Sequence, residues 1–217
     1  MNIENIKKNG FLESEDILSA NDLILLKKFV VDQIDKLPNK NFRLYENSFI
    51  NSIISDEKFN FKIQKLISDI VKYNFNKYYD KKPKIYKVLR VVSGKKQKKQ
   101  ANLYHFDAHL ITLLIPILIP KNPNMKNGDL VIFPNIRRVH KMLFLNILQK
   151  IFYQNIITRN LLKLNFVKKL LNHRVLKITP GKIYAFNGFS SLHGNLEIDP
   201  NSIRATLLIH AYDVFED

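Results

Sequence analysis

Tyr104-His105-Phe106-Asp107-Ala108-His109 leads into the apolar run Leu110 to Ile119, and this stretch organises the rest of the chain. The apolar run has the character of a buried strand, and His105 and Asp107 stand two residues apart at its mouth. In an extended segment, residues i and i+2 point to the same face, so an imidazole and a carboxylate project together. A metal bound by this pair needs a further ligand, and the chain offers His193 in Ser190-Ser191-Leu192-His193-Gly194.

The composition indicates a protein that can bury a sizeable core. The chain has 217 residues, of which 46% are hydrophobic, and we expect one domain over residues 1–217. It has no cysteine, which excludes disulfides, thiolate zinc sites and cysteine nucleophiles. The polar N-terminus does not have the pattern of a signal peptide, and no run approaches the roughly 20 apolar residues that span a bilayer. We therefore expect a cytoplasmic protein.

The formal net charge of +16 favours an anionic partner, which is a nucleic acid, an anionic membrane surface or an acidic substrate. A general over-use of lysine, asparagine and isoleucine explains the total equally well. Nucleic acid is not expected, since the chain has no recognised reader motif and its basic loop at residues 95–100 lacks interleaved stacking aromatics.

Two helices followed by about seven short strands are predicted along the chain. After a polar lead-in over residues 1–20, Leu23 to Ile34 carries a broad apolar face behind a helix start capped by Ser19 or Asn21. A second helix begins near residues 55–57. Strands are predicted at residues 85–92, 110–119, 128–134, 175–178, 182–186, around 193 and 203–212. This order predicts an α+β protein with a double-stranded β-helix core, a jelly roll of the cupin-like kind, buttressed by the N-terminal helices.

The candidate ligands suit Fe(II). Two histidines and one carboxylate, with the other coordination positions open, form the ligand set of non-heme Fe(II) oxygenases. Arg204, eleven residues after His193, can hold a carboxylate through two parallel hydrogen bonds. Thr206 would face the same way as Arg204 and add a hydroxyl group, and Asn195 stands in the same relation to His193.

His105-x-Asp107, the distal His193 and Arg204-x-Thr206 together resemble the Fe(II)/2-oxoglutarate-dependent dioxygenases. Residues 128–134 and 180–194 look most like the phytanoyl-CoA dioxygenase-like branch. The resemblance implies a hydroxylase that uses Fe(II), 2-oxoglutarate and O2 and releases succinate and CO2. It assigns His105, Asp107 and His193 to iron, and Arg204 and Thr206 to the C5 carboxylate of 2-oxoglutarate. The presence of Asp107 favours hydroxylation, because the halogenases of the family lack this carboxylate.

Further candidates lie close to this set in the sequence. In the family a polar side chain on the preceding strand often contacts 2-oxoglutarate, and Tyr86 and Arg90 are the candidates, with Arg90 also a candidate for substrate binding. Asn195 is a further candidate for the cofactor. His109 is assigned a role beside the ligands or against the substrate, and the set His105, Asp107 and His109 binding zinc satisfies the spacing equally well.

Each of these residues also has a purely structural interpretation. His105 and Asp107 could form an ordinary hydrogen-bonded pair, His193 could be a loop residue, and Arg204 could lie on the surface of a strand. The enzyme interpretation fails only if all of these hold together. The remaining histidines have no spacing that suggests ligation and are assigned to the surface or to packing: His140, His173 and His210.

A basic, apolar and helical insertion is predicted at residues 137–174. There is no Asp or Glu from Leu130 through Leu196, a stretch that contains eleven Lys and Arg residues. Such a segment is typical of an interfacial membrane helix. Alternatively, its apolar face packs on the β core or on another subunit. Because it falls between the two halves of the iron site, the insertion is placed to form a lid or a substrate wall.

The sequence therefore predicts an oxygenase that acts on a small-molecule or lipid-linked anionic substrate, such as an acidic sugar, a lipid or an acyl group. A peripheral membrane contact through residues 137–174 is part of this prediction. The competing interpretation is a non-catalytic β-barrel binding module that docks on an anionic membrane or on nucleic acid. The oligomeric state stays open.

Overall fold

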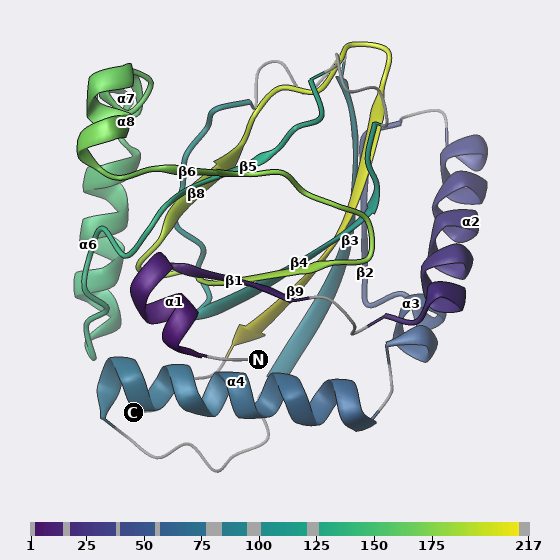
Figure 1. The fold of residues 1–217 in the computed structure, drawn as a ribbon, viewed down its shortest axis with the longest axis horizontal. Helices are drawn as coiled ribbons and strands as arrows, with labels where there is room; N and C mark the ends of the chain where they lie inside the picture. The colour runs from purple at the N-terminus through teal and green to yellow at the C-terminus, as the bar shows by residue number, and fades with distance from the viewer. Residues whose placement is uncertain are drawn as a thin grey trace.

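Two antiparallel sheets face each other in the computed structural model, which describes residues 3–14, 18–37, 40–54, 57–76, 84–94, 101–120 and 126–212 (Figure 1). The six-stranded sheet has the order β1-β7-β4-β9-β3-β2, and the three-stranded sheet has the order β6-β5-β8. The strands are β1 (Phe11–Ser14), β2 (Phe42–Tyr45), β3 (Lys84–Ser93), β4 (Ile111–Leu118), β5 (Leu130–Phe133), β6 (Arg174–Leu176), β7 (Ile183–Asn187), β8 (Leu192–Asn195) and β9 (Ile203–Tyr212). This is the mainly β, jelly-roll-like architecture with helices that the sequence predicted.

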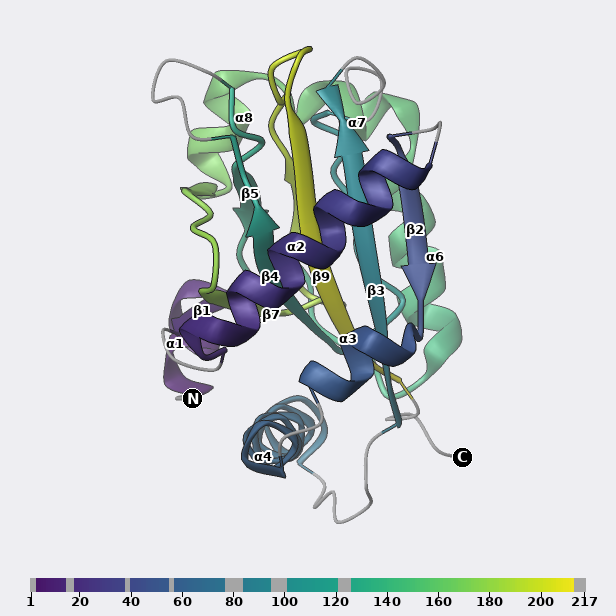
Figure 2. The same cartoon turned by 90° about the vertical axis from the view of Figure 1, so that its right-hand side faces the viewer.

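Helices cover the outer face of the six-stranded sheet. In Figure 2, α2 (Ala20–Lys36) crosses this face and α4 (Glu57–Phe75) lies at one end of it. α2 begins at Ser19, whose hydroxyl accepts the N–H of Asp22 while the Asp22 carboxylate accepts the N–H of Ser19. The apolar sides of both helices share one core with the sheet, and this core includes Leu26, Val30, Ile67, Leu113 and Leu207. The predicted buttressing by N-terminal helices is confirmed.

Side chains along β9 alternate between two environments. Ala205, Leu207 and Ile209 join the core under the helices, whereas Leu208 and His210 line a cavity on the opposite face. Because successive side chains of a strand point to opposite faces, Arg204 shares the inner face with Leu208 and His210. The candidate site is built on this inner face, between the two sheets.

The N-terminal part of the chain holds more structure than the sequence predicted. Residues 1–20, expected to be a polar lead-in, contain α1 (Ile3–Asn9) and β1, which pairs with β7 at the edge of the sheet. β2, which pairs with β3, and α3 (Ser48–Ile53) were also not predicted. Four-residue strands carry little periodicity, and they form because a sheet edge is available to them. The predicted lead-in is therefore wrong, and the predicted basic loop at residues 95–100 lies outside the described residues.

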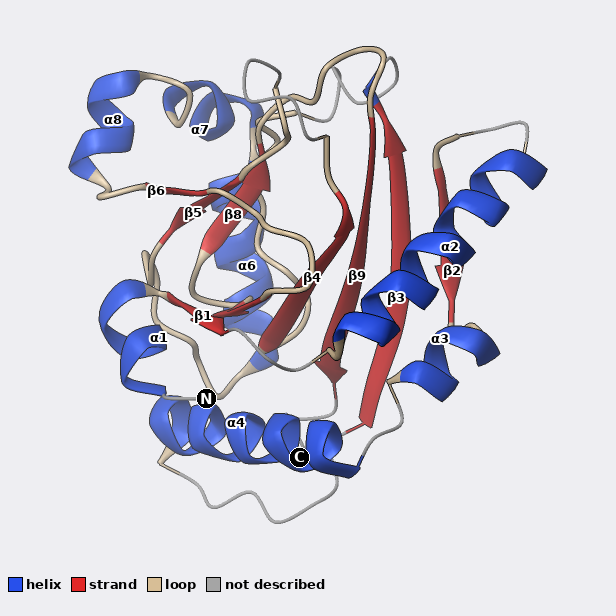
Figure 3. Ribbon diagram, turned by 45° about the vertical axis from the view of Figure 1, so that its right-hand side comes forward, coloured by secondary structure: helices blue, strands red, loops and turns tan. Residues whose placement is uncertain are grey.

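The insertion at residues 137–174 is helical, as predicted. It forms α6 (Leu143–Gln154), α7 (Ile156–Leu161) and α8 (Asn165–Leu170), which lie on the side of β5, β6 and β8 (Figure 3). Arg137 opens it but is not part of its basic surface, because only 7% of the residue is exposed. Its guanidinium donates to the carbonyls of Phe189 and Asn146 and lies 4.0 Å from the centre of the Phe106 ring. Arg137 therefore fastens the insertion to the loop that carries the candidate ligands.

Candidate metal centre and its cavity

Two backbone segments meet at the site. The N–H of His105 donates to the carbonyl of His193 on β8 at 2.9 Å, and the N–H of His193 donates back to His105 at 3.0 Å. Asp107 follows, with its N–H hydrogen-bonded to the carbonyl of Gly188 at 3.0 Å. This pairing extends the three-stranded sheet by a single bridge. It brings the two imidazoles side by side, with ring centroids 4.5 Å apart.

The side chains of His105, Asp107 and His193 converge on one point. Their ligand atoms all lie within 4.8 Å of one another. His105 Nε2 is 3.7 Å from Asp107 Oδ1, and His193 Nε2 is 3.5 Å from Asp107 Oδ2. The fold therefore brings together the three residues that the sequence singled out as iron ligands.

Backbone carbonyls determine the tautomer of both imidazoles. His105 Nδ1 lies 3.1 Å from the carbonyl oxygen of Leu103, and His193 Nδ1 lies 3.2 Å from that of Ser191. A carbonyl oxygen only accepts, so each Nδ1 carries a hydrogen, and each Nε2, which faces Asp107, is the ring nitrogen available to a metal ion. Metal-binding histidines are oriented in this way. Two imidazole nitrogens and a carboxylate fit Fe(II) as a donor set.

The charge states at the site suit metal binding. Burial raises the pKa of the Asp107 carboxyl, but the imidazoles of His193 and His105 outweigh this effect and hold the pKa well below its usual range. Burial, reinforced by His193, lowers the pKa of His105 to about 4. An ionised carboxylate and a neutral imidazole are the forms that bind a metal ion.

Asp107 is also held from the six-stranded sheet. The hydroxyl of Thr112 on β4 donates to Asp107 Oδ2, and it lies 3.1 Å from His210 Nδ1 on β9. Because the one hydroxyl hydrogen goes to Asp107, His210 Nδ1 is the donor in the second contact. His210, which the sequence assigned to the surface or to packing, is therefore the end of a polar chain behind Asp107. Burial is the main reason that its pKa is lowered to about 4.

His109 lies beside the ligands rather than among them. Its Nε2 is 3.1 Å from the hydroxyl of Tyr86, and its ring centroid lies 4.6 Å from that of His210. In the described part of the chain, the metal-competent group contains His193 and not His109, so the alternative zinc set is not the one that the fold assembles. This position agrees with the predicted role of His109 beside the ligands.

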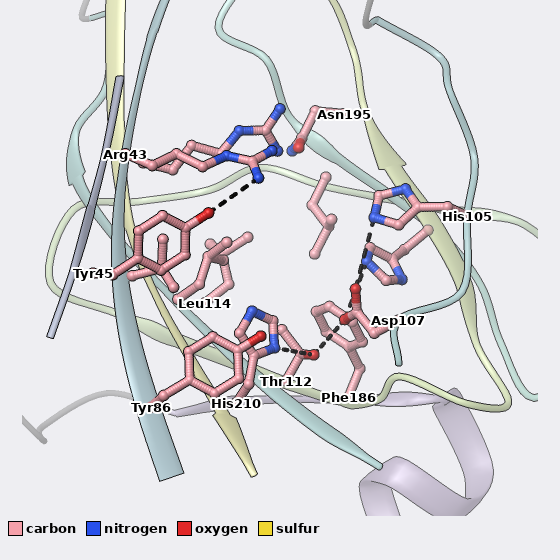
Figure 4. A pocket seen from close by; sticks show the side chains of 15 residues that line it. Arg43, Tyr45, Tyr86, His105, Asp107, Thr112, Leu114, Phe186, Asn195 and His210 are labelled. Atoms are coloured by element: carbon pink, nitrogen blue, oxygen red, sulfur yellow. Dashed lines mark hydrogen bonds and ion pairs between the residues drawn. The ribbon is translucent and has the colours of Figure 1, made fainter. Parts of the chain in front are cut away.

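A cavity of about 220 Å³ opens next to the three candidate ligands (Figure 4). Arg43 on β2 and Arg90 on β3 face each other in register, and both line it. Figure 4 shows Arg43 and Asn195 across the cavity from Asp107. Among the described residues that form the lining, Asp107 is the only acid. The cavity is therefore polarised, with a metal-binding end and a basic end. Apolar side chains form the wall between them: Val88, Leu114, Leu130, Phe186 and Leu208.

Arg204 and Thr206, the predicted 2-oxoglutarate residues, lie at the basic end but outside the residues that line the cavity. Arg204 is 2% exposed, and its Nη1 donates to the carbonyl of Gly128 at 2.6 Å. Only glycine fits there, since a Cβ on residue 128 would lie 2.6 Å from that Nη1. Thr206 stands opposite Arg90 in the β3–β9 ladder. Asn195 does line the cavity, and its amide also donates to the Gly128 carbonyl, at 3.2 Å.

Four polar residues that line the cavity were not predicted as site residues: Arg43, Tyr45, Thr112 and His210. Thr112 carries a signal that could have identified it, because it is the one hydrogen-bonding side chain in the apolar run from Leu110 to Ile119. His210 could be placed only by its partnership with Thr112 across the β4–β9 ladder. Arg43 and Tyr45 lie on β2, which the sequence did not predict.

Neither a protein-family model nor a curated protein sequence matches this chain. Solved structures do. A prolyl-4-hydroxylase from Pseudomonas putida is 10% identical with a TM-score of 0.57, over 96% of this chain and 95% of that one. EctD from S. alaskensis with bound Fe is 12% identical with a TM-score of 0.55, over 96% and 75%. An oxidoreductase of the 2OG-Fe(II) oxygenase family from Burkholderia pseudomallei is 10% identical with a TM-score of 0.55, over 97% and 87%. At such identities the likeness shows the fold alone, and it confirms the predicted double-stranded β-helix.

Proposed function

We propose that this protein is an Fe(II)- and 2-oxoglutarate-dependent oxygenase that hydroxylates a small anionic or membrane-associated molecule. The observation that carries the proposal is the convergence of His105, Asp107 and His193, with both imidazole tautomers set by backbone carbonyls. Three protein donors leave the other coordination positions of the metal open. The fold shared with a structure of the 2OG-Fe(II) oxygenase family supports the same choice.

The residues of the chain supply geometry and charge to this reaction. When bound, Fe(II), 2-oxoglutarate and O2 would supply the oxidising chemistry, with succinate and CO2 as products. Thr112 holds the Asp107 carboxylate in place, and Leu114 and Phe186 line the cavity and exclude water. Through the resemblance, Asp107 favours hydroxylation over halogenation. Placement in the phytanoyl-CoA dioxygenase-like branch rests on the strand sequences at residues 128–134 and 180–194.

We assign the C5 carboxylate of 2-oxoglutarate to the basic end of the cavity. Arg204 and Thr206 are the residues that the resemblance indicates, and Arg90 joins them from the neighbouring strand. Burial, followed by the charge of Arg43, lowers the pKa of Arg90. Two guanidinium groups brought together in this way favour an anion between them. Arg43, which lines the same end of the cavity beside Arg90, supports an anionic substrate in addition to 2-oxoglutarate.

Succinate formation tests the proposal, because turnover uncoupled from substrate oxidation does not require the unknown substrate. Protein reconstituted anaerobically with Fe(II) and then exposed to air should convert 2-oxoglutarate to succinate. Asp107→Ala and Arg204→Ala should abolish the signal. The exposed positions Asp32 and Arg138 supply matched controls, and their alanine variants should keep it.

Calorimetric titration separates the two ends of the cavity. Asp107→Ala should lose Co(II) binding, whereas Arg204→Ala and Arg90→Ala should bind Co(II) normally and lose affinity for 2-oxoglutarate. A wild-type protein that neither binds Co(II) nor forms succinate would be the non-catalytic binding module instead.

A further inference from the structure

α6 presents its apolar side to solvent. Asn146 is 2% exposed and Lys150 is half-buried, so the polar side of the helix faces the protein. At about 100° per residue, the exposed apolar residues all fall on the opposite side. A helix on a protein surface ordinarily shows the reverse arrangement. These apolar residues are 37–67% exposed: Phe144, Leu145, Ile147, Leu148, Ile151 and Phe152.

Specific contacts hold α6 in this orientation. The Asn146 side chain donates to the carbonyl of His140 at 2.8 Å and accepts the N–H of His140 at 2.9 Å. The carbonyl of Asn146 accepts Nη1 of the buried Arg137 at 2.7 Å. On the next turns, Tyr153 packs edge-on against Phe106, with ring centroids 5.5 Å apart. Rotating α6 to bury its apolar side would break all of these contacts, so the exposure is built into the fold.

α7 and α8 also expose large apolar side chains. Ile156 and Ile157 are 76% and 70% exposed, and Phe166 and Leu170 are 67% and 80% exposed. The three helices lie on one side of the molecule (Figure 1). We call the exposed apolar residues of α6, α7 and α8 the apolar face. So many exposed large apolar side chains on three neighbouring helices mark a binding surface.

The charges that the insertion itself carries are all of one sign. Lys141, Lys163, Lys169 and Arg174 are exposed along the insertion, and no Asp or Glu occurs from residue 130 through residue 196, all of which the structure describes. Apolar side chains flanked by cations match an anionic lipid surface, where headgroups attract the cations and the acyl boundary takes the apolar groups.

A second copy of the chain does not fit this surface. In a two-fold dimer the same patch meets itself, which would bring the cations of the insertion together with no acid of the insertion to pair them. Within the described part of the chain, no helix is long and apolar enough to cross a membrane. We propose that the apolar face docks on the surface of an anionic lipid bilayer, with α6, α7 and α8 lying in the plane of the interface.

Docking would hold the metal site at the membrane. Tyr153 packs against Phe106, and the Gln154 amide donates to the carbonyl of Phe106 at 3.4 Å. Phe106 stands between His105 and Asp107 in the chain. A substrate drawn from the bilayer, through its acyl chain or anionic headgroup, fits this arrangement. The docking is independent of the metal, whereas the choice of a lipid substrate rests on the proposed function.

Vesicle flotation of the metal-free protein tests the docking, with phosphatidylcholine vesicles that contain or lack phosphatidylglycerol. The wild-type protein should float with the anionic vesicles, and high salt should weaken the binding. Ile151→Ser/Leu170→Ser should lower the partition coefficient by at least about tenfold. Ile24→Ser/Phe61→Ser is the matched control, since these residues are 61% and 69% exposed on α2 and α4, and it should float like the wild type.

A second pair of variants tests the charge. Removing three cations beside the apolar face, in Lys163→Gln/Lys169→Gln/Arg174→Gln, should weaken binding roughly 100-fold at about 0.1 M salt, where the Debye length is about 10 Å. The same loss of charge on α2 and α4, in Lys28→Gln/Lys36→Gln/Lys65→Gln, should have an effect below about threefold, because charges beyond the Debye length are screened.

Three results would overturn the docking: no flotation with anionic vesicles, flotation that both insertion variants leave unchanged, or a dimer in sedimentation that Ile151→Ser/Leu170→Ser dissociates. Co(II) titration of the same samples keeps the two proposals apart. Protein that binds Co(II) but does not float contradicts only the docking, and protein that floats but does not bind Co(II) contradicts only the proposed oxygenase.

Discussion

Thr112→Val isolates the hydroxyl that holds the metal-binding carboxylate. Valine is β-branched like threonine and close to it in size, so the backbone and the packing around residue 112, which is 2% exposed, should be kept. The substitution removes the donor to Asp107 Oδ2 and the acceptor for His210 Nδ1. Asp107 would then lose the contact that orients its second oxygen toward His193.

The size of the effect follows from the charge on Asp107. A hydrogen bond to an ionised group contributes about 1.5–3 kcal/mol. Loss of a partner that orients a metal ligand lowers metal affinity by about 10–100-fold. At 1.4 kcal/mol per factor of ten, the two figures agree. We expect Thr112→Val to bind Co(II) about 10–100-fold more weakly than the wild type.

Anaerobic calorimetry with Co(II) measures this change, and circular dichroism checks that the variant folds. Thr206→Val is the matched control, since Thr206 is 3% exposed in the same sheet and the substitution likewise replaces a hydroxyl group by a methyl group. It should bind Co(II) within about twofold of the wild type and, under the proposed assignment, bind 2-oxoglutarate more weakly. A folded Thr112→Val protein with wild-type Co(II) affinity would refute the role of the hydroxyl.

Three further perturbations test other parts of the structure. The folded pKa of His210, about 4, lies below its ordinary value of 6.5, so the unfolded chain binds more protons between these values. The contribution of neutral His210 to the free energy of unfolding of the metal-free protein should be fully present above pH 6.5. It should fall by up to about 3 kcal/mol as the pH is lowered toward 4. Denaturation at several pH values should show that the free energy of unfolding of His210→Gln falls less steeply with decreasing pH than that of the wild type. The same pH dependence in both proteins would contradict this. Arg137→Met removes a buried guanidinium from two carbonyls and should lower the free energy of unfolding by about 3 kcal/mol, against about 0.5 kcal/mol or less for the exposed Arg138→Met. Urea denaturation compares the two variants, and similar losses of stability would argue against the role of Arg137 in fastening the insertion. Gly188→Ala places a Cβ 2.8 Å from that of Asp107, so calorimetry should show Co(II) affinity reduced by at least about tenfold. Unchanged affinity would mean that the loop can shift without moving the ligand.

The three candidate ligands could be recognised from the sequence because each stands in a distinctive local setting. His105 and Asp107 precede an apolar run, and His193 lies between turn signals at a fixed distance before Arg204. Local spacing also predicted the helical insertion. What it could not give was the short edge elements, since β1 and β2 exist through pairing with β7 and β3.

At the basic end of the cavity, too, some residues could be recognised from the sequence and others only from the way the strands pair. Arg43 reaches it because β2 pairs with β3, which places residues 43 and 90 opposite each other. Arg204 was identified by its spacing from His193, yet its guanidinium is engaged by the carbonyl of Gly128. A strand pattern assigns a side chain to a face but not to a partner on that face, because the partner comes from another segment of the chain.

By itself, the sequence determined the two long N-terminal helices, the strands from β3 to β9, the three candidate ligands and an amphipathic, acid-free insertion. Only the tertiary structure decided that His210 stands behind Asp107 and that α6 turns its apolar side to solvent. Helical periodicity predicts that a helix has an apolar and a polar side, but it does not predict which side packs against the rest of the protein. For α6 that choice was made by distant partners, since the contacts of Asn146 with Arg137 and of Tyr153 with Phe106 hold the polar side inward.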